Sequence, residues 1–358
     1  MVATEGSIRI GLIGFGLGGS VFHAPLISAT PGLELVAVVT RDRERANTVH
    51  SRFPQARVVS DVQELWKAND LDLIVISTVN SAHAPLGLAA LEAGLPVVMD
   101  KPLAPSAADA QRLIDVARTR GLMLTVFQNR RWDSDFLTLR ATLDDGAIGT
   151  PTRFESRYER WRPSLKADAW RERPGRDEAG GLLFDLGSHL IDQAMQLFGR
   201  PTHVYAELDA RRAGAAVDDD AFVALVHPGE VRSHLWMSAV ARLHGPRFRV
   251  LGTAGAFESF GLDGQEDALA AGGDPRDPAW GTEPTERWGT LATDEGERSI
   301  ESRRGDYPAF YAAVERAVRT GGPPPVDPVD SADGLRVIEA AARSADDGAV
   351  VATEWPDG

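Results

Sequence analysis

An acidic residue and a histidine lie four positions apart in the second half of the chain, and together they could move a proton. Asp185 and His189 have the spacing that places two side chains on one face of a helix. The ordinary pKa of histidine lies near neutral pH, so its ring can accept a proton from an alcohol. The carboxylate can hold a hydroxyl group and bias the charge of the ring. We therefore expect an acid–base pair.

Two other interpretations of this pair stay open. Asp192 comes three residues after His189 and could orient the ring, which would then be a packed histidine at a helix start. Alternatively, Asp185 and His189 could be two ligands of a metal ion, as in a metal-dependent hydrolase. The sequence offers no convincing third ligand, so we expect no metal site.

A lysine follows a short apolar run in the first half of the chain. The segment 96–100 is expected to be a buried strand, and Asp100 and Lys101 stand where it ends. Ligands bind at the carboxyl ends of strands in open α/β sheets. An ammonium group there could donate a hydrogen bond to a reacting hydroxyl group. The alternative is a surface lysine at a strand end, which is the commonest environment of lysine.

Three glycines form a G-x-G-x-x-G motif near the start of the chain. Gly14, Gly16 and Gly19 follow an expected strand at 8–14 and open an expected helix that runs to about residue 29. Without side chains, the backbone N–H groups can approach a pyrophosphate at the positive end of the helix. The motif predicts a dinucleotide site, with a plain glycine turn as the alternative.

The end of the second expected strand bears on which dinucleotide would bind. An acidic residue usually stands there in NAD sites, whereas this chain has Thr40 and Arg41. Threonine can hydrogen-bond a phosphate, and arginine can pair with its charge and stack on adenine. We therefore expect NADP rather than NAD. Asp42 is the counter-argument, because it could bend back to a ribose hydroxyl group.

The elements that must position these residues follow two different rhythms. Strands and helices alternate over residues 1–128, which predicts an α/β fold with a doubly wound parallel sheet, the Rossmann arrangement. Over residues 129–358, successive strands at 202–210, 221–227, 231–238 and 246–251 predict a C-terminal α/β domain with an open, mainly antiparallel sheet. Residues 262–296 are rich in Gly, Pro, Asp and Glu and are expected to form a long surface excursion.

Composition limits the classes of partner. The 358 residues carry a net charge of −14, which argues against nucleic acid as the main partner. Cysteine is absent, so disulfides and thiolate chemistry are excluded, and a reducing cytoplasm fits. No apolar run is long enough for a membrane span.

Several motifs together resemble the glucose–fructose oxidoreductase, inositol dehydrogenase and rhizopine-catabolism (Gfo/Idh/MocA) family. The Glu-Lys-Pro of the family corresponds to Asp100-Lys101-Pro102, and its Thr-Pro-x-x-x-His element corresponds to residues 78–83 without the proline. Its Gly-Gly-x-x-x-Asp-x-Gly-x-His segment corresponds to residues 180–189. Residues 22–27 and 129–136 resemble a bacterial branch that includes NADP-dependent scyllo-inositol dehydrogenases.

The resemblance implies an oxidoreductase that transfers a hydride between a nicotinamide and a secondary alcohol or ketone of a sugar or cyclitol. It also implies a homodimer or homotetramer formed through the C-terminal sheet. The catalytic group would be Lys101, Asp185 and His189. The expected cofactor contacts are Gly14, Phe15, Gly16, Leu17, Gly19, Thr40, Arg41, Thr78, Asn80, His83, Asp100, Lys101, Asn129, Trp170 and Arg171. The expected substrate contacts are Lys101, Arg160, Asp185, His189 and Tyr307. A non-catalytic, NADP-binding sensor of the same architecture is the alternative.

Overall fold

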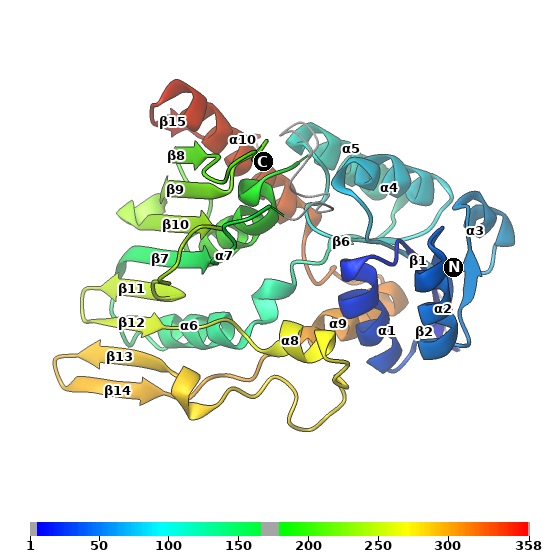
Figure 1. Cartoon of the computed structure of the whole chain (residues 1–358), viewed down its shortest axis with the longest axis horizontal. Helices are drawn as coiled ribbons and strands as arrows, with labels where there is room; N and C mark the ends of the chain where they lie inside the picture. Colours follow the sequence, from blue (N-terminus) through cyan, green and yellow to red (C-terminus); the bar gives the residue numbers. More distant parts are fainter. Residues whose placement is uncertain (1–5, 166–178, 357–358) are drawn as a thin grey trace. The chain divides into compact units, whose positions relative to one another are not determined.

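A computed structural model describes residues 6–165 and 179–356 of the chain (Figure 1). The chain divides into two compact units, and each unit is assembled from separate stretches of sequence. The first unit comprises the chain up to Asn129 together with Gly264–Trp280 and Asp306–Ser331. The second unit comprises Arg130–Asp263, Gly281–Gly305 and the chain from Ala332 onward. Each unit is described below by itself.

Parallel strands form a six-stranded sheet in the first unit, in the order β3-β2-β1-β4-β5-β6. This order confirms the predicted doubly wound sheet. The strands are β1 (Ile8–Ile13), β2 (Leu33–Val39), β3 (Arg57–Val59), β4 (Leu73–Ile76), β5 (Val97–Met99) and β6 (Leu124–Val126). The direction of winding reverses between β1 and β4, which is where ligands bind in sheets of this kind.

Helices and short helical turns connect these strands. They are η1 (Gly18–His23), α1 (Ala24–Ala29), α2 (Arg43–Arg52), α3 (Gln63–Ala68), η2 (Asn80–Ala82), α4 (His83–Glu92) and α5 (Ala107–Arg120). The central strands β1, β4, β5 and β6 are almost entirely buried, as expected when helices cover both faces of a sheet.

Two later helices also belong to the first unit. They are α8 (Gln265–Ala270) and α9 (Tyr307–Thr320). Helix α9 packs beside α1 (Figure 1) and buries Phe310 and Tyr311 completely. The ring centroid of Phe310 lies 5.0 Å from that of Phe127, just after β6. The nucleotide-binding fold is thus completed by residues about 180 positions further along the chain.

The second unit contains a nine-stranded sheet in the order β14-β13-β12-β11-β7-β10-β9-β8-β15 (Figure 1). Only β7 and β10 pair in parallel among these strands of the described residues, so the predicted, mainly antiparallel sheet is confirmed. The strands are β7 (Pro151–Glu159), β8 (His203–Asp209), β9 (Asp220–Val226), β10 (Arg232–Ser238), β11 (Phe248–Gly252), β12 (Gly255–Ser259), β13 (Gly289–Thr293), β14 (Gly296–Ile300) and β15 (Val351–Ala352).

The helical elements of this unit are α6, η6, α7, η7, η8 and most of α10. Their bounds are α6 (Ser134–Asp144), η6 (Leu183–Gly187), α7 (Ser188–Phe198), η7 (Pro228–Glu230), η8 (Thr285–Arg287) and α10 (Pro328–Asp347). A further short turn, η3 (Asn129–Trp132), stands where the first unit passes into the second.

The two faces of this sheet differ in character. Leu235 and Met237 of β10 are fully buried, and α7 packs against the same strand. Between them Trp236 is half-buried, and its register partners are Phe222 on β9 and Arg157 on β7. The strict alternation shows that one face forms the core, while the other presents aromatic and charged side chains.

The sequence-based prediction of a long surface excursion over residues 262–296 was wrong. This stretch contains α8, η8 and β13, and β13 pairs with β12 on one side and β14 on the other (Figure 1). The β13–β14 hairpin extends the sheet at its edge, where β14 is largely exposed. Polar residues are typical of edge strands, so their composition resembles that of a loop.

Across the part of the chain that the structure describes, no helix combines the length and the apolar character needed to cross a membrane.

Candidate active site

The glycine motif forms a backbone cradle between β1 and η1. Gly14 has a φ of +96°, and a Cβ atom there would lie 2.1 Å from the backbone oxygen of Ser77. A Cβ on Gly19 would lie 2.3 Å from the oxygen of Gly14, so this glycine permits close packing. At Gly16, by contrast, the nearest atom to such a Cβ is a guanidinium nitrogen of Arg45, at 3.9 Å.

These three environments match the three roles of glycine in a dinucleotide loop: the turn, the approach of the pyrophosphate and the close helix packing. The open space at Gly16 fits a nicotinamide dinucleotide. Of the flanking residues, Leu17 is exposed and can contact a ligand, whereas Phe15 is buried. Phe15 packs edge-on against Phe53 and therefore supports the loop from within.

The end of β2 presents cationic side chains, while its acidic residue is already engaged. Asp42 accepts hydrogen bonds from the N–H groups of Glu44 and Arg45, at 2.9 and 3.0 Å, and so caps α2. These bonds hold the pKa of Asp42 below its ordinary value, against a small opposing effect of desolvation. Thr40 is half-buried, and Arg41 is exposed, with its Nε 3.3 Å from the carbonyl oxygen of Ser60.

The loop after β4 stands next to the glycine cradle. The methyl group of Thr78 lies close to Gly14, and Asn80 begins the turn η2. His83, an expected cofactor contact, is fully buried. Its Nδ1 lies 2.7 Å from the carbonyl oxygen of Pro102, and burial lowers the pKa of the ring. His83 thus supports the segment that follows Lys101.

Asp100 and Lys101 stand at the carboxyl end of β5. The backbone N–H of Lys101 donates to Oδ1 of Asp100 at 2.9 Å, and the hydroxyl of Ser77 donates to Oδ2 at 2.8 Å. Burial would raise the pKa of Asp100, but polar contact with His23, followed by the charges of His83 and Lys101, holds it well below its ordinary value. The carboxyl group is therefore an anion at neutral pH. The Lys101–Pro102 peptide bond is cis.

The expected acid–base pair, Asp185 and His189, lies in the second unit, at the junction of two helical elements. Asp185 belongs to the π-helical turn η6, whereas His189 belongs to the first turn of α7. The sequence predicted one continuous helix here. The structure corrects this prediction, because Asp185 lies in a wider π-helical turn that precedes α7. π-Turns occur frequently at functional sites. His189 is 6% exposed, and Asp185 is half-buried.

The start of η6 is anchored by a buried carboxylate. Oδ2 of Asp218 accepts from the N–H of Leu183 at 2.8 Å. Its Oδ1 would lie only 2.1 Å from a Cβ on Gly181, whose φ is +95°. Any larger residue at 181 would therefore displace either Asp218 or the turn that carries Asp185.

Helix α7 is held by charged contacts to η3 and to the sheet. Arg131 pairs with Asp192, whose two oxygens both accept from the guanidinium group. Gln193 donates to the carbonyl oxygen of Arg130 and accepts from Arg247. Both oxygens of Asp192 thus bind Arg131, and the alternative in which Asp192 also orients His189 stays open.

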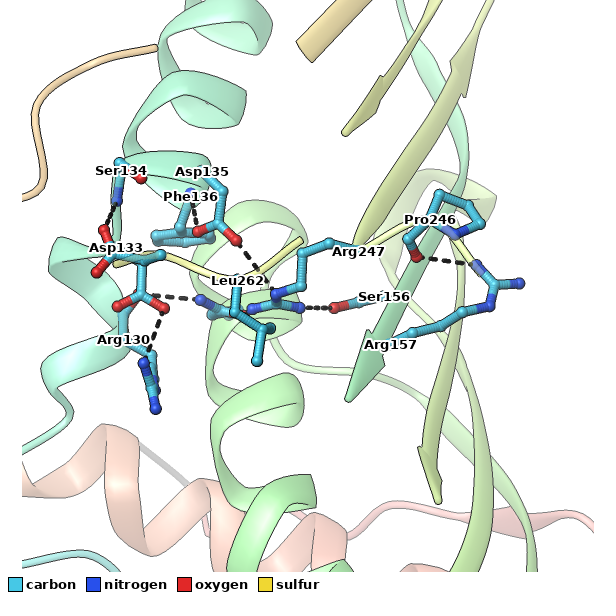
Figure 2. A network of polar contacts seen from close by, with 12 residues as sticks. Arg130, Asp133, Ser134, Asp135, Phe136, Ser156, Arg157, Pro246, Arg247 and Leu262 are labelled. Carbon is cyan, nitrogen blue, oxygen red and sulfur yellow. Dashed lines mark hydrogen bonds and ion pairs between the residues drawn. The ribbon is translucent and has the colours of Figure 1, made fainter. Parts of the chain in front are cut away.

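Arg247 joins this helix to a buried polar network (Figure 2). One terminal nitrogen donates to the hydroxyl of Ser156 at 2.6 Å, and its Nε lies 3.2 Å from Oδ2 of Asp135. Burial raises the pKa of Asp135 to about 6, although the charge of Arg247 opposes the shift. The guanidinium also lies 4.4 Å from the ring centroid of Tyr158, which packs it further.

The other predicted contact residues differ in their exposure to solvent, and two of them are not described. Asn129 is buried, and Arg160 is half-buried, with its backbone N–H donating to Ser238. Tyr307 is fully buried beside Phe22, and its substrate contact stays a prediction. Trp170 and Arg171 lie outside the described residues.

Sequence reasoning missed three residues that support this machinery. His23 and Tyr311 lie against Asp100 in the first unit, and Asp218 anchors η6 in the second. His23 lies within residues 22–27, which resemble a bacterial branch of the family. This resemblance was the one signal in the sequence that pointed to His23. Tyr311 and Asp218 are distant in sequence from the residues they support and carry no local motif.

The fold and both family models define one class of protein. An oxidoreductase family with an NAD-binding Rossmann fold matches residues 8–128, and the GFO/IDH/MocA C-terminal domain matches residues 136–258. The chain belongs to the GFO/IDH/MocA family of oxidoreductases, as its motifs indicated.

Similar proteins extend over almost the whole chain. The scyllo-inositol 2-dehydrogenase (NADP(+)) IolW of Bacillus subtilis is 35% identical over 342 residues, which cover 94% of each chain. The uncharacterized oxidoreductase YdgJ of Escherichia coli is 39% identical and covers 95% of this chain and 96% of its own. The solved structure of yvaA from Bacillus subtilis has a TM-score of 0.92 at 34% identity, with 98% of this chain and 99% of that chain covered.

Proposed function

We propose that the protein is an NADP-dependent dehydrogenase that interconverts a secondary alcohol and a ketone on a sugar or cyclitol. The observation that carries the cofactor choice is the capping role of Asp42. Its carboxylate is bound to the N-terminus of α2, while Arg41 and Arg45 stay exposed. A ribose 2′-phosphate would meet cations there, and a 2′-hydroxyl would lack its usual carboxylate.

Arg45 is placed to serve the same phosphate-binding region. Its guanidinium nitrogen approaches Gly16, and its Nε lies 3.8 Å from Asp42 at the surface. The printed name of IolW, a relative that is 35% identical, includes NADP(+), which supports the same choice.

The cofactor test compares kcat/KM with NADPH and with NADH. We expect Arg41→Ala and Arg45→Ala to lower the value with NADPH by at least ~10-fold, since each removes a charged contact to phosphate. The value with NADH should change little. Arg52→Ala, at the far end of α2, is the matched control. A wild-type preference for NADH would overturn the assignment.

When bound, the nicotinamide supplies the hydride donor or acceptor. In the oxidation direction, His189 takes the proton from the substrate hydroxyl group, and Asp185 holds a neighbouring hydroxyl group. Lys101 donates a hydrogen bond to the reacting oxygen as it becomes a carbonyl oxygen. In the reduction direction the same groups return the proton.

A neutral polyol is the substrate class that suits these groups. Asp185, His189 and Lys101 offer hydrogen-bond donors and acceptors, which hydroxyl groups can use in both directions. The relative IolW is named for scyllo-inositol, so inositols and inososes head the panel of substrates. Turnover is followed by NADPH fluorescence. Tight NADPH binding without turnover of any polyol or ketone would favour the non-catalytic sensor, which the matched dehydrogenases do not support.

We also propose that the exposed sheet face forms a homodimer or homotetramer. Phe222, His234 and Trp236 are half-buried neighbours on β9 and β10, with ring centroids 5.2 to 6.0 Å apart. Arg157 stacks at 4.0 Å on Trp236. A continuous aromatic patch is typical of a subunit interface. Light scattering should show an oligomer that Trp236→Glu dissociates, and a monomeric wild type would contradict this.

A further inference from the structure

A buried histidine connects the residue before Lys101 to a distant helix. His23, at the end of η1, is fully buried, and its Nδ1 lies 2.6 Å from the hydroxyl oxygen of Tyr311 on α9. Its Nε2 lies 3.6 Å from Oδ2 of Asp100. Among the described residues no atom lies within hydrogen-bond distance of this Nε2. Asp100 is therefore the polar group that this nitrogen faces.

The chemistry of the three groups fixes the direction of the hydrogen bonds. Asp100 is an anion and can only accept, so it favours a proton on Nε2 of His23. In the neutral ring Nδ1 then accepts, and Tyr311 donates. Burial, and after it the charge of Asp100, raises the pKa of Tyr311 well above its ordinary value, so its hydroxyl group keeps the proton it donates.

The surroundings hold this ring in place. Phe127 lies against it, with ring centroids 4.5 Å apart, and Tyr311 meets it edge-on. The titratable groups that face Asp100 are His23, His83 and Lys101. His83 is fully buried, and burial lowers its pKa, so Lys101 is the cation that balances the carboxylate.

Asp100 contacts two parts of the site, so the position of its carboxylate affects both. Through Oδ1 it accepts the backbone N–H of Lys101, and through Oδ2 it accepts the hydroxyl of Ser77. A Cβ on Gly18 would lie 2.6 Å from the same Oδ2, so the carboxylate also packs against the start of η1. A displaced Asp100 would shift Lys101 and the glycine cradle together.

We propose that His23 and Tyr311 are positioning residues for Lys101. Tyr311 selects the tautomer of His23 that carries the proton on Nε2, and this N–H directs the Asp100 carboxylate that holds the backbone of Lys101. The inference rests on the proposed function for its kinetic consequence, whereas the tautomer itself does not depend on any substrate.

The first test observes the ring directly. The full-length protein is labelled with ¹⁵N-histidine, and His23→Gln identifies the His23 signals in long-range ¹H–¹⁵N spectra. The expected result is a neutral ring protonated on Nε2 at pH 7. A ring protonated on Nδ1 alone, or on both nitrogens, would overturn the proposal. This outcome is independent of turnover, so failure to find a substrate would count against the proposed function and not against the tautomer.

The second test removes only the tyrosine hydroxyl group. Tyr311→Phe should shift His23 toward the Nδ1 tautomer and lower kcat by about 10-fold, as loss of a supporting hydrogen bond does elsewhere. KM and the Kd for NADPH should stay within about 2-fold. Tyr205→Phe removes an exposed hydroxyl group and is the control.

A purely structural role predicts a different result. Tyr311→Phe would then unfold at lower urea concentration with kcat unchanged, and that combination would overturn the proposal. His23→Phe, which has no side-chain N–H, should lower kcat more than Tyr311→Phe, because it also removes the donor that faces Asp100. The reverse order would contradict the proposed direction of the chain of contacts.

Discussion

Arg131 binds both oxygens of Asp192, with Nε 2.8 Å from Oδ2 and Nη2 2.6 Å from Oδ1. Asp192 lies three residues after His189 on α7, so this pair fixes the helix that presents the proposed base. Both side chains are nearly buried, at 11% and 5% exposure, and a planar guanidinium holds the carboxylate in a single orientation. The pair restrains the rotation of α7 about its own axis.

Breaking the Arg131–Asp192 pair should lower both the free energy of unfolding and the activity of the protein. Arg131→Ala leaves a buried carboxylate without its cation, and we expect the free energy of unfolding to fall by ~3–5 kcal/mol. Urea unfolding measures the loss. Arg211→Ala removes a pair whose partners are 56% and 45% exposed, and it should cost only ~0–1 kcal/mol. Similar losses in the two variants would contradict the structural role of Arg131.

The two glycines of the cradle should separate folding from cofactor binding. Gly16→Ala places a methyl group in open space, so the thermal midpoint should hold while the Kd for NADPH rises by at least ~10-fold. Gly14→Ala would force a Cβ to 2.1 Å from the oxygen of Ser77 at a φ of +96°, and it should lower the midpoint. Calorimetry and fluorescence titration test both variants. Unchanged NADPH affinity in Gly16→Ala would exclude this loop as the phosphate site.

Lys101 should matter for the chemical step more than for cofactor binding. We expect Lys101→Ala to lower kcat by ~100-fold or more, because it removes an interaction made in the transition state. The Kd for NADPH should be nearly unchanged. Steady-state kinetics and fluorescence titration measure the two quantities, and near-normal turnover would remove Lys101 from the mechanism.

Asp135 should make stability depend on pH in the acid range. Its pKa is about 6 in the folded protein, above the ordinary value of 3.8, so the folded state keeps a proton that the unfolded state has lost. The stabilising contribution is therefore complete below pH ~4 and disappears as the pH rises through about 6, by at most ~3 kcal/mol.

Asp135→Asn should remove this part of the pH dependence. Urea unfolding at several pH values would then show a smaller decrease in the free energy of unfolding between pH ~4 and ~6 than in the wild type. The exposed Asp209→Asn serves as the control. Parallel curves for wild type and Asp135→Asn would show that Asp135 is ionised throughout.

Much of the fold could be predicted because its signals are local. Apolar runs such as Leu73–Ile76 and the glycine motif each lie within a few residues. Long-range packing is harder to predict. Tyr311 meets His23 across 288 positions, and no periodicity or motif connects them.

The errors of the sequence-based predictions have a similar cause, because the interactions that decide these structures join residues that are distant in the sequence. The predicted surface excursion over residues 262–296 instead contains β13, which pairs with β12 and β14. The many Gly, Pro, Asp and Glu residues around β13 suggested a loop. The π-turn that carries Asp185 depends on Asp218, which lies 33 positions later in the chain.

The discontinuous make-up of the first unit limits how this protein can be rearranged. An artificial or evolutionary fusion that transplanted only its initial 128 residues would leave behind α9, and with it the cover of Phe127 and the hydroxyl group beside His23. Such a transplant would expose aromatic surface and aggregate. The first unit therefore depends on residues from the C-terminal third of the chain. A fusion that exchanges only the N-terminal part of this unit would separate it from those residues.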